Sequence, residues 1–240
     1  MTAAGKRVVC IVEAAGWTGI GEPGIHTVAY RELAAVVRDC PSTCQEPTRE
    51  DLLGHLRVME QVMASQTVIP VAYGTVAATE EAVREGLLAA RYEDLRALLQ
   101  RLEGRVELGL KALWREMGLI FAEVVAEQET IRALRDAIAA RPAAHTRQEV
   151  IELGHMVADA MEAKKRREGG EMLDALSPLA AEARFGRLLG EKMVLNAAFL
   201  VDRARETEFD AQVARLGEER GSRLLFRYVG PAPPFNFVDS

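Results

Sequence analysis

The stretch Arg105–Trp114, RVELGLKALW, has the clearest strand pattern in the chain. Its apolar residues occupy every second position: Val106, Leu108, Leu110, Ala112 and Trp114. Glu107 and Lys111 fall between them. Because successive side chains of a strand point to opposite faces, this alternation predicts a strand with one face in a core and one in water. Such half-buried strands are typical of antiparallel sheets.

The residues before this strand predict a mixture of strands and helices. Arg7 to Glu13 is a continuous apolar run, typical of a strand buried on both faces. His26 to Arg38 mixes β-branched and polar residues, and we predict a strand pair there, with a poor helix as the alternative. These elements and the two helices that follow favour a ferredoxin-like α+β domain over residues 1–115.

The two predicted helices of this part both have a threonine at the start. Thr48 can cap the first, with Asp51 completing a capping box. Its predicted buried face consists of Leu52, Leu56, Met59 and Met63. His55 lies off that face and is expected to be exposed. Thr79 can cap the second helix, which Gly104 ends.

The residues after the strand predict a helical domain over residues 116–240. One helix is expected from Met117 to Ala140, and a long one from Thr146, where Thr146 and Glu149 can form a capping box. Joined by a short loop, the two predict a long antiparallel helical hairpin with a coiled-coil-like contact. The segments MVLNAAFLV, ETEFDAQVARLGEERG and RLLFRYVG then read as strand, amphipathic helix and strand, completing a small sheet with the Trp114 strand. Phe209, Val213 and Leu216 are expected on one side of that helix.

The chain ends on LLFRYVGPAPPFNFVDS, which is unusually aromatic for a terminus. Two functions are open for this tail: it docks on the chain's own sheet, or it offers an aromatic surface to a hydrophobic partner. We favour docking, because exposed aromatic side chains are unfavourable in water. The residues concerned are Phe226, Tyr228, Pro231, Pro233, Pro234, Phe235 and Phe237.

Composition and charge exclude several classes of protein. A net charge of −6 and a pI near 5.4 argue against binding of nucleic acid. The basic run KKRRE, Lys164 to Glu168, is predicted to be a solvated helix face, with an anion-binding patch as the alternative. The charge-free stretch Ala64 to Thr79 is shorter than the roughly 20 apolar residues that span a bilayer. The start of the chain has too short an apolar run for a secretory signal, so we expect a cytoplasmic protein.

No catalytic, cofactor or metal site is predicted. GIGEPG, Gly19 to Gly24, matches G-x-G-x-x-G, but six residues separate it from the preceding strand and no helix is expected behind it. A nucleotide-binding enzyme that uses this loop is therefore a minor alternative. Cys40 and Cys44 lack the usual zinc spacing and a fourth ligand beside His55. The histidines, His26, His55, His145 and His155, lie in unrelated contexts.

Several segments, taken together and in order, resemble the gas vesicle GvpL/GvpF family. They are VIPVAYGTV, GRVELGLKALW, EVIELGHMV, NAAFLVD with EFDAQVARL, and the ending LLFRYVGPAPPFNFV. The opening segments RVVCIVEAAG and LAAVVRDCP are similar to the N-terminal part of that family. Tyr73, Phe235 and His155 are conservative departures from the family pattern.

The resemblance implies an accessory protein of gas vesicle assembly without enzymatic activity. It implies an N-terminal ferredoxin-like domain and a C-terminal domain built around a coiled coil. The expected partners are the small hydrophobic shell protein, whose aggregation the protein would limit during nucleation, and other gas vesicle accessory proteins. It would be gas vesicle associated and could remain a minor vesicle component. A scaffold that recruits other assembly factors through the hairpin is the alternative.

Overall fold

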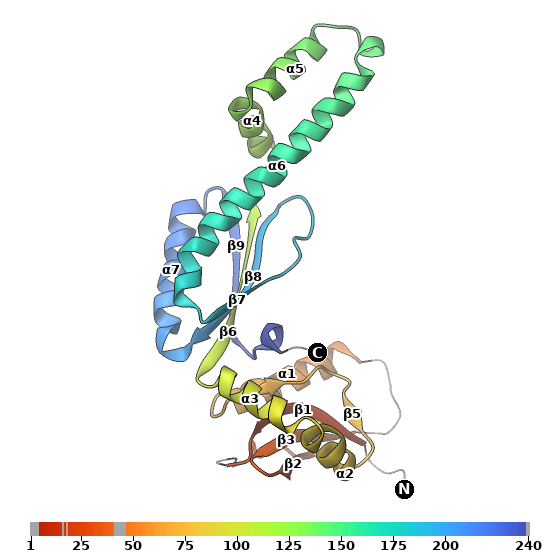
Figure 1. Ribbon diagram of the computed structural model, residues 1–240, viewed down its shortest axis with the longest axis vertical. Helices are drawn as coiled ribbons and strands as arrows, with labels where there is room; N and C mark the ends of the chain where they lie inside the picture. The colour runs from red at the N-terminus through yellow and green to blue at the C-terminus, as the bar shows by residue number, and fades with distance from the viewer. Residues whose placement is uncertain (1–4, 16, 18, 41–46, 239–240) are drawn as a thin grey trace. The chain divides into compact units, whose positions relative to one another are not determined.

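A computed structural model gives the fold and describes residues 5–15, 17, 19–40 and 47–238 (Figure 1). The chain forms two compact units. Unit 1 comprises Met1–Leu108, Leu200–Arg203 and Gly230–Ser240, and unit 2 comprises Gly109–Phe199 and Ala204–Val229. Residues near the C-terminus therefore belong to the same unit as the N-terminal part.

Unit 1 is built on an antiparallel sheet. Its strands are β1 (Gly5–Glu13), β2 (Ile25–Tyr30), β3 (Leu33–Cys40), β4 (Ile69–Pro70) and β5 (Val76–Ala77). The order is β2-β3-β1-β4, with β5 also pairing with β1. Residues Val8 to Val12 are all at most 1% exposed, which confirms the strand buried on both faces. The predicted strand pair within His26–Arg38 is confirmed as β2 and β3.

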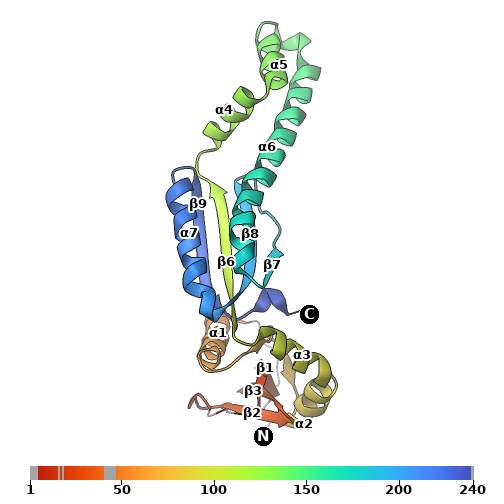
Figure 2. The same ribbon diagram turned by 60° about the vertical axis from the view of Figure 1, so that its left-hand side comes forward.

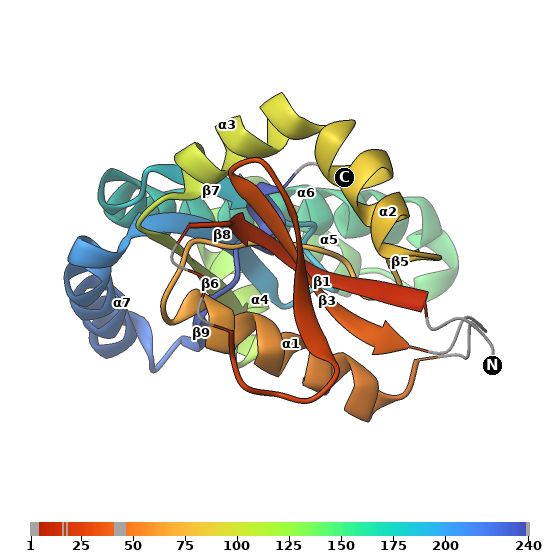
Figure 3. The same ribbon diagram turned by 90° about the horizontal axis from the view of Figure 1, so that it is seen from below.

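Helices cover both faces of this sheet. Figure 3 shows α1 (Arg49–Met63) on one side of β1 and β3, and α2 (Glu80–Val83) and α3 (Tyr92–Leu102) on the other. A π-helical turn, η1 (Arg84–Ala89), follows α2 directly. The Thr48 capping box is confirmed, since the Asp51 backbone N–H donates to the Thr48 hydroxyl at 3.1 Å. The Thr79 cap is confirmed in the same way.

Two details of unit 1 differ from the sequence prediction. A ferredoxin-like domain has the order β-α-β-β-α-β, whereas three strands precede the first helix here, so the ferredoxin-like assignment is not confirmed. The buried face of α1 is also turned from the predicted one. Leu52 is 41% exposed while His55 is 5% exposed, so the prediction of an exposed His55 was wrong. Burial of His55 is possible because its Nε2 bonds to the Val71 carbonyl at 2.9 Å.

The second sheet has the strand order β7-β8-β6-β9. Its strands are β6 (Arg105–Trp114), β7 (Glu182–Phe185), β8 (Met193–Asp202) and β9 (Leu224–Ala232). Figure 2 shows α6 (Arg147–Leu176) and α7 (Glu206–Arg220) in front of the strands, on the same face of the sheet. The apolar residues of β6 are buried and Lys111 is exposed, as predicted, but Glu107 is buried. The three C-terminal elements and the apolar side of α7 are confirmed.

The predicted helical hairpin of unit 2 is confirmed with a break in its first arm. Instead of one helix there are two, α4 (Met117–Glu127) and α5 (Glu129–Ala139), separated by Gln128 in an extended conformation. The capping box predicted for α6 was wrong. The Thr146 hydroxyl faces back to the Ala143 carbonyl, at 3.4 Å, because a 3₁₀ turn (Ala143–His145) leads directly into α6. None of the described helices combines the length and apolarity needed to cross a membrane.

Candidate functional site

The tail residues predicted as a site divide between the two units. Phe226 and Tyr228 lie on β9 in unit 2 and are half-buried. The rest belong to unit 1, where β9 ends at Ala232 and a 3₁₀ turn, η5, covers Phe235–Phe237. The exposure of these residues differs sharply: Pro231 is exposed, Pro233 and Pro234 are buried, Phe235 is 38% exposed and Phe237 is 0% exposed.

Polar contacts hold the last turn in unit 1. The backbone and side-chain nitrogens of Asn236 both donate to the Glu107 carboxylate, at 2.8 and 2.6 Å. The Arg101 guanidinium donates to the Phe237 carbonyl. Burial raises the pKa of Glu107, and the two bonds from Asn236 oppose that rise. The sequence did not point to Glu107 or Arg101, because both lie more than 100 residues away from the residues that they bind.

The β9 residues of the predicted site pack on α7. The Tyr228 hydroxyl donates to Asp210 Oδ1 at 2.5 Å, and its ring stacks on Phe209, with 6.3 Å between centroids. Phe209 in turn contacts Phe199 of β8 at 5.1 Å between centroids. Burial and the neighbouring Asp210 raise the pKa of Tyr228, so it remains a hydrogen-bond donor. This side of β9 is therefore rigidly packed.

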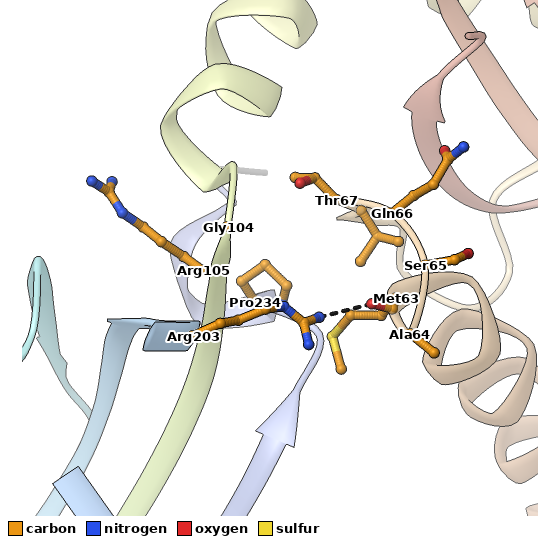
Figure 4. A pocket seen from close by; sticks show the side chains of 10 residues that line it. Met63, Ala64, Ser65, Gln66, Thr67, Gly104, Arg105, Arg203 and Pro234 are labelled. Atoms are coloured by element: carbon orange, nitrogen blue, oxygen red, sulfur yellow. Dashed lines mark hydrogen bonds between the residues drawn. The ribbon is translucent and has the colours of Figure 1, made fainter. Parts of the chain in front are cut away.

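A small cavity of about 270 Å³ lies beside the tail in unit 1. Figure 4 shows Arg203 and Pro234 on one side of it and the segment Met63–Thr67 on the other. Arg203 donates to the Met63 carbonyl at 2.7 Å, so its guanidinium links the two sides of the cavity. None of the described residues that line it is an acid, a histidine or a cysteine. The hydroxyls of Ser65 and Thr67 therefore have no general base among these residues to activate them.

A second crevice of unit 1, about 380 Å³, is charged but balanced. Its lining carries Arg7, Arg38 and Arg57 together with three acids, and Arg38 is paired with Glu22 at 2.7 Å. His55 also lines it, and burial lowers the pKa of His55, which favours the neutral ring. An equal number of opposite charges gives little attraction for the phosphates of a cofactor.

The remaining predicted candidates form no common site. The Gly19–Gly24 segment is a loop with positive φ at Gly19, Gly21 and Gly24, and it leads into β2. Cys40 is buried, and Cys44 lies outside the described residues. His26 contacts Glu80 at 3.2 Å, and His145 and His155 are exposed. Within the part of the chain that the structure describes, no group of three or more His, Cys, Asp or Glu residues could hold a metal ion.

Unit 2 contains a buried cluster of charges where a solvated helix face was predicted. Lys164, Lys165 and Glu168 are only 4%, 7% and 8% exposed, so the prediction was wrong for these three residues. Arg166 and Arg167, between them, are exposed as predicted. Lys164 Nζ lies 2.6 Å from Glu127 and 3.0 Å from Glu123, both on α4. Arg223, just before β9, pairs with Glu123 and, at 2.7 Å, with Glu168. The burial is possible because every one of these charges has an opposite partner.

An aromatic side chain joins this cluster to the sheet. The Trp114 indole N–H donates to Glu168 Oε2 at 2.7 Å. The hydrogen bond from Arg223, with Lys164 adding to it, lowers the pKa of Glu123 to about 2. Lys164 likewise lowers the pKa of Glu127. The carboxylates of Glu123 and Glu168 raise the pKa of Arg223. This cluster links α4 and α6 to β6 and to the residue before β9, and we call it the arm-base cluster: Trp114, Glu123, Glu127, Lys164, Glu168 and Arg223.

The low pKa of Glu123 predicts a loss of stability in acid. Because the pKa in the folded state lies below the ordinary value of 4.5, ionised Glu123 stabilises the fold above that pH. This contribution should disappear as the pH falls from 4.5 toward about 2. Thermal melts across this range should show a smaller pH dependence for Glu123→Gln than for the unaltered chain. An equal dependence in both would contradict the assignment.

The α4 helix leaves apolar side chains uncovered. Its sequence, MGLIFAEVVAE, is apolar on nearly every side, yet only Ile120 and Val124 are buried. Leu119 is 64% and Phe121 is 41% exposed. A helix that is apolar on all sides is normally buried on all sides. The exposed apolar residues of α4 are therefore a candidate surface for a hydrophobic partner.

Comparison with known proteins places this geometry in a family. The model of the family described as gas vesicle synthesis protein GvpL/GvpF matches residues 6–239. A curated relative, gas vesicle protein F of Haloferax mediterranei, is 30% identical over 222 residues, covering 91% of this chain and 84% of the relative. Gas vesicle protein F of a Streptomyces species is 30% identical, covering 92% of this chain and 91% of the relative.

Solved structures share the fold over the full chain. The crystal structure of the gas vesicle protein GvpF from Anabaena sp. PCC7120 superposes with a TM-score of 0.87 at 24% identity, covering 99% of each chain. That of GvpF from Microcystis aeruginosa gives 0.83 at 23% identity, covering 98% of this chain and 99% of the other. The mixed helix and sheet architecture is thus that of these crystal structures.

Proposed function

Because the chain belongs to the gas vesicle synthesis protein GvpL/GvpF family and so has a role in gas vesicle assembly, we propose that it binds the small hydrophobic shell protein. By covering apolar surface of the shell protein, it limits aggregation while vesicles nucleate. It is associated with the gas vesicle and takes part in no catalytic step.

The exposed apolar residues of α4 are the observation that favours this proposal. Leu119 and Phe121 are exposed on α4, whose two charged residues, Glu123 and Glu127, are paired with Lys164. Removing apolar surface from water contributes roughly 25 cal/mol per Å², so a hydrophobic client gains by covering these side chains. The tail is a weaker candidate, because Phe237, Pro233 and Pro234 are already buried in unit 1.

Replacing Leu119 and Phe121 together with serine should abolish this activity without unfolding the chain. Both side chains are exposed, so the melting temperature should change little. The measurement is light scattering of shell protein diluted from denaturant in the presence of each variant. We expect the double variant to suppress scattering at least about tenfold less effectively, as for loss of a hot spot worth more than about 1.4 kcal/mol.

The matched control is Leu52→Ser with Leu53→Ser, since those residues are each 41% exposed on α1. Equal loss with both double variants would show non-specific hydrophobic binding and contradict the α4 site. Unchanged suppression by the α4 variant would also contradict it.

The alternative function, a scaffold that recruits other assembly factors through the helical hairpin, predicts a different pattern of partners. Separate pull-downs with the shell protein and with the other gas vesicle accessory proteins distinguish the two functions. Capture of accessory proteins alone would favour the scaffold, and capture of shell protein that depends on Leu119 and Phe121 would favour the proposal made here.

A further inference from the structure

The outer edge of β9 is open in unit 2. In the strand order β7-β8-β6-β9, β9 is a terminal strand whose only neighbour among the described strands is β6. An edge strand has a row of backbone N–H and C=O groups that another strand can pair with. The packing of Tyr228 on Phe209 and Asp210 holds β9 in place from the helix side. The edge is therefore preformed.

The register of β6 and β9 places two cations opposite each other. The Arg115 N–H donates to the Arg223 carbonyl at 3.0 Å. A Cβ on Gly109 would lie 3.0 Å from the Val229 side chain. Along the chain, Gly109 precedes Arg115 by the same number of residues by which Val229 follows Arg223. This antiparallel register puts Lys111 opposite Arg227, between the pairs Leu113/Leu225 and Gly109/Val229.

These two cations lack an anionic partner within the described chain. Lys111 and Arg227 are both exposed, and neither makes an ion pair or a side-chain hydrogen bond with any described residue. Like charges directly opposite on neighbouring strands destabilise a sheet. Leu225 and Val229, on either side of Arg227 along β9, are 37% and 63% exposed. The surface is thus a positive centre between two apolar side chains.

We propose that the β9 edge binds an extended segment of a protein partner that carries one Asp or Glu between two apolar residues on the same face. Such a segment would continue the sheet through backbone hydrogen bonds, and its carboxylate would lie beside Arg227 and Lys111. This binding surface uses residues other than Leu119 and Phe121, so it goes beyond the function proposed above.

Two other occupants fit the surface less well. Antiparallel pairing of β9 with a second copy, centred on Arg227, would place two arginines opposite each other. A polyanion such as nucleic acid or an acidic membrane is disfavoured, because the chain has a net charge of −6 and this surface has only two cations. A single carboxylate in an apolar strand matches both the charge and its apolar surroundings.

The test is binding of designed peptides to the full-length chain. The probe is the capped peptide TSVSESVST, in which Val, Glu and Val face one side of a strand; the matched peptides have Gln or Lys in place of Glu. Amide chemical shifts of the labelled chain should change saturably at β9 and β6 with the Glu peptide. Affinity should fall about tenfold with Gln, in line with roughly 1.5 kcal/mol for a hydrogen bond to a charged group, and further with Lys.

Arg227→Glu should reverse this preference, so that the Lys peptide binds better than the Glu peptide. Arg96→Glu, at an exposed position of α3, makes the same change in net charge and should leave binding unaltered. Absence of saturable shifts, shifts away from β9, or equal affinity for the Glu and Lys peptides would each overturn the proposal. Self-association through β9, detected by sedimentation and abolished by Arg227→Glu, would identify a second copy as the occupant instead. The Leu119→Ser, Phe121→Ser variant should bind the Glu peptide normally, so this test is independent of shell-protein binding.

Discussion

Replacing Phe237 with alanine is expected to lower the free energy of unfolding by about 3–5 kcal/mol, the usual cost of removing a fully buried aromatic side chain. Phe237 is 0% exposed in unit 1, although it is only three residues from the end of the chain. Asn236 and the Arg101 bond hold its backbone on both sides. The site therefore has little freedom to collapse around the smaller side chain. Chemical denaturation of the full chain measures the change.

Phe235→Ala is the control for this prediction. Phe235 lies two residues earlier in the same 3₁₀ turn but is 38% exposed. We expect this variant to lose roughly 1 kcal/mol or less, as for most surface substitutions. If the tail anchors the fold, capture of the shell protein by Phe237→Ala should fall only as far as folding falls. A stable Phe237→Ala variant that no longer captures shell protein would show that the tail is a binding surface.

The sequence could predict that aromatic side chains of the tail stabilise the fold, but not which ones. Phe235 and Phe237 stand in the same short motif, PFNF, and share its composition. What separates them is the 3₁₀ turn, which directs Phe237 into unit 1 and leaves Phe235 exposed. Turn geometry of this kind depends on the distant partners Glu107 and Arg101, which no local pattern records.

Local periodicity predicted those elements well in which each face has one kind of surroundings, either core or solvent. The alternation in β6, the continuous apolar run in β1 and the apolar side of α7 all appear in the structure as expected. The prediction failed at His55, where a polar residue replaces an apolar one on the buried face of α1. A hydrogen bond to Val71 makes this substitution possible, and side-chain hydropathy alone cannot show it.

The prediction of a solvated helix face at Lys164–Glu168 failed for a related reason. Charged side chains of a helix usually lie in solvent, and no residue within the run indicates that Glu123 and Arg223 lie beside it. These partners are 41 and 59 residues from Lys164, counted from their positions at 123, 164 and 223. Buried ion pairs are a property of the tertiary fold. The alternative of an anion-binding patch is also disfavoured, because Lys164 and Lys165 each have a carboxylate partner.

Removing the Arg223 charge should be the most damaging change in unit 2. In Arg223→Met, Glu123 and Glu168 lose their shared cation, and Glu168 keeps only the Trp114 indole as a described partner. Breaking a buried pair by removing one member costs about 3–5 kcal/mol. Since the Arg223 side chain is 29% exposed, we expect a value near 3 kcal/mol, the lower end of that range. Denaturant unfolding followed by tryptophan fluorescence measures it, with Trp17→Phe in every variant so that Trp114 of unit 2 gives the signal.

Arg220→Met provides the matched comparison, because the Arg220 side chain is 28% exposed and pairs with Glu171 at 2.8 Å. Glu171 is itself 48% exposed, so water can solvate it when the cation is removed. A surface pair of this kind contributes about 0–1 kcal/mol. The difference between the two arginines at equal exposure therefore isolates the effect of the buried carboxylate.

Adding Glu123→Gln and Glu168→Gln to Arg223→Met should recover part of the stability, since no uncompensated charge then remains in the arm-base cluster. Equal losses for Arg220→Met and Arg223→Met, or no recovery in the triple variant, would mean that Arg223 stabilises unit 2 through the packing of its alkyl chain and not through its charge.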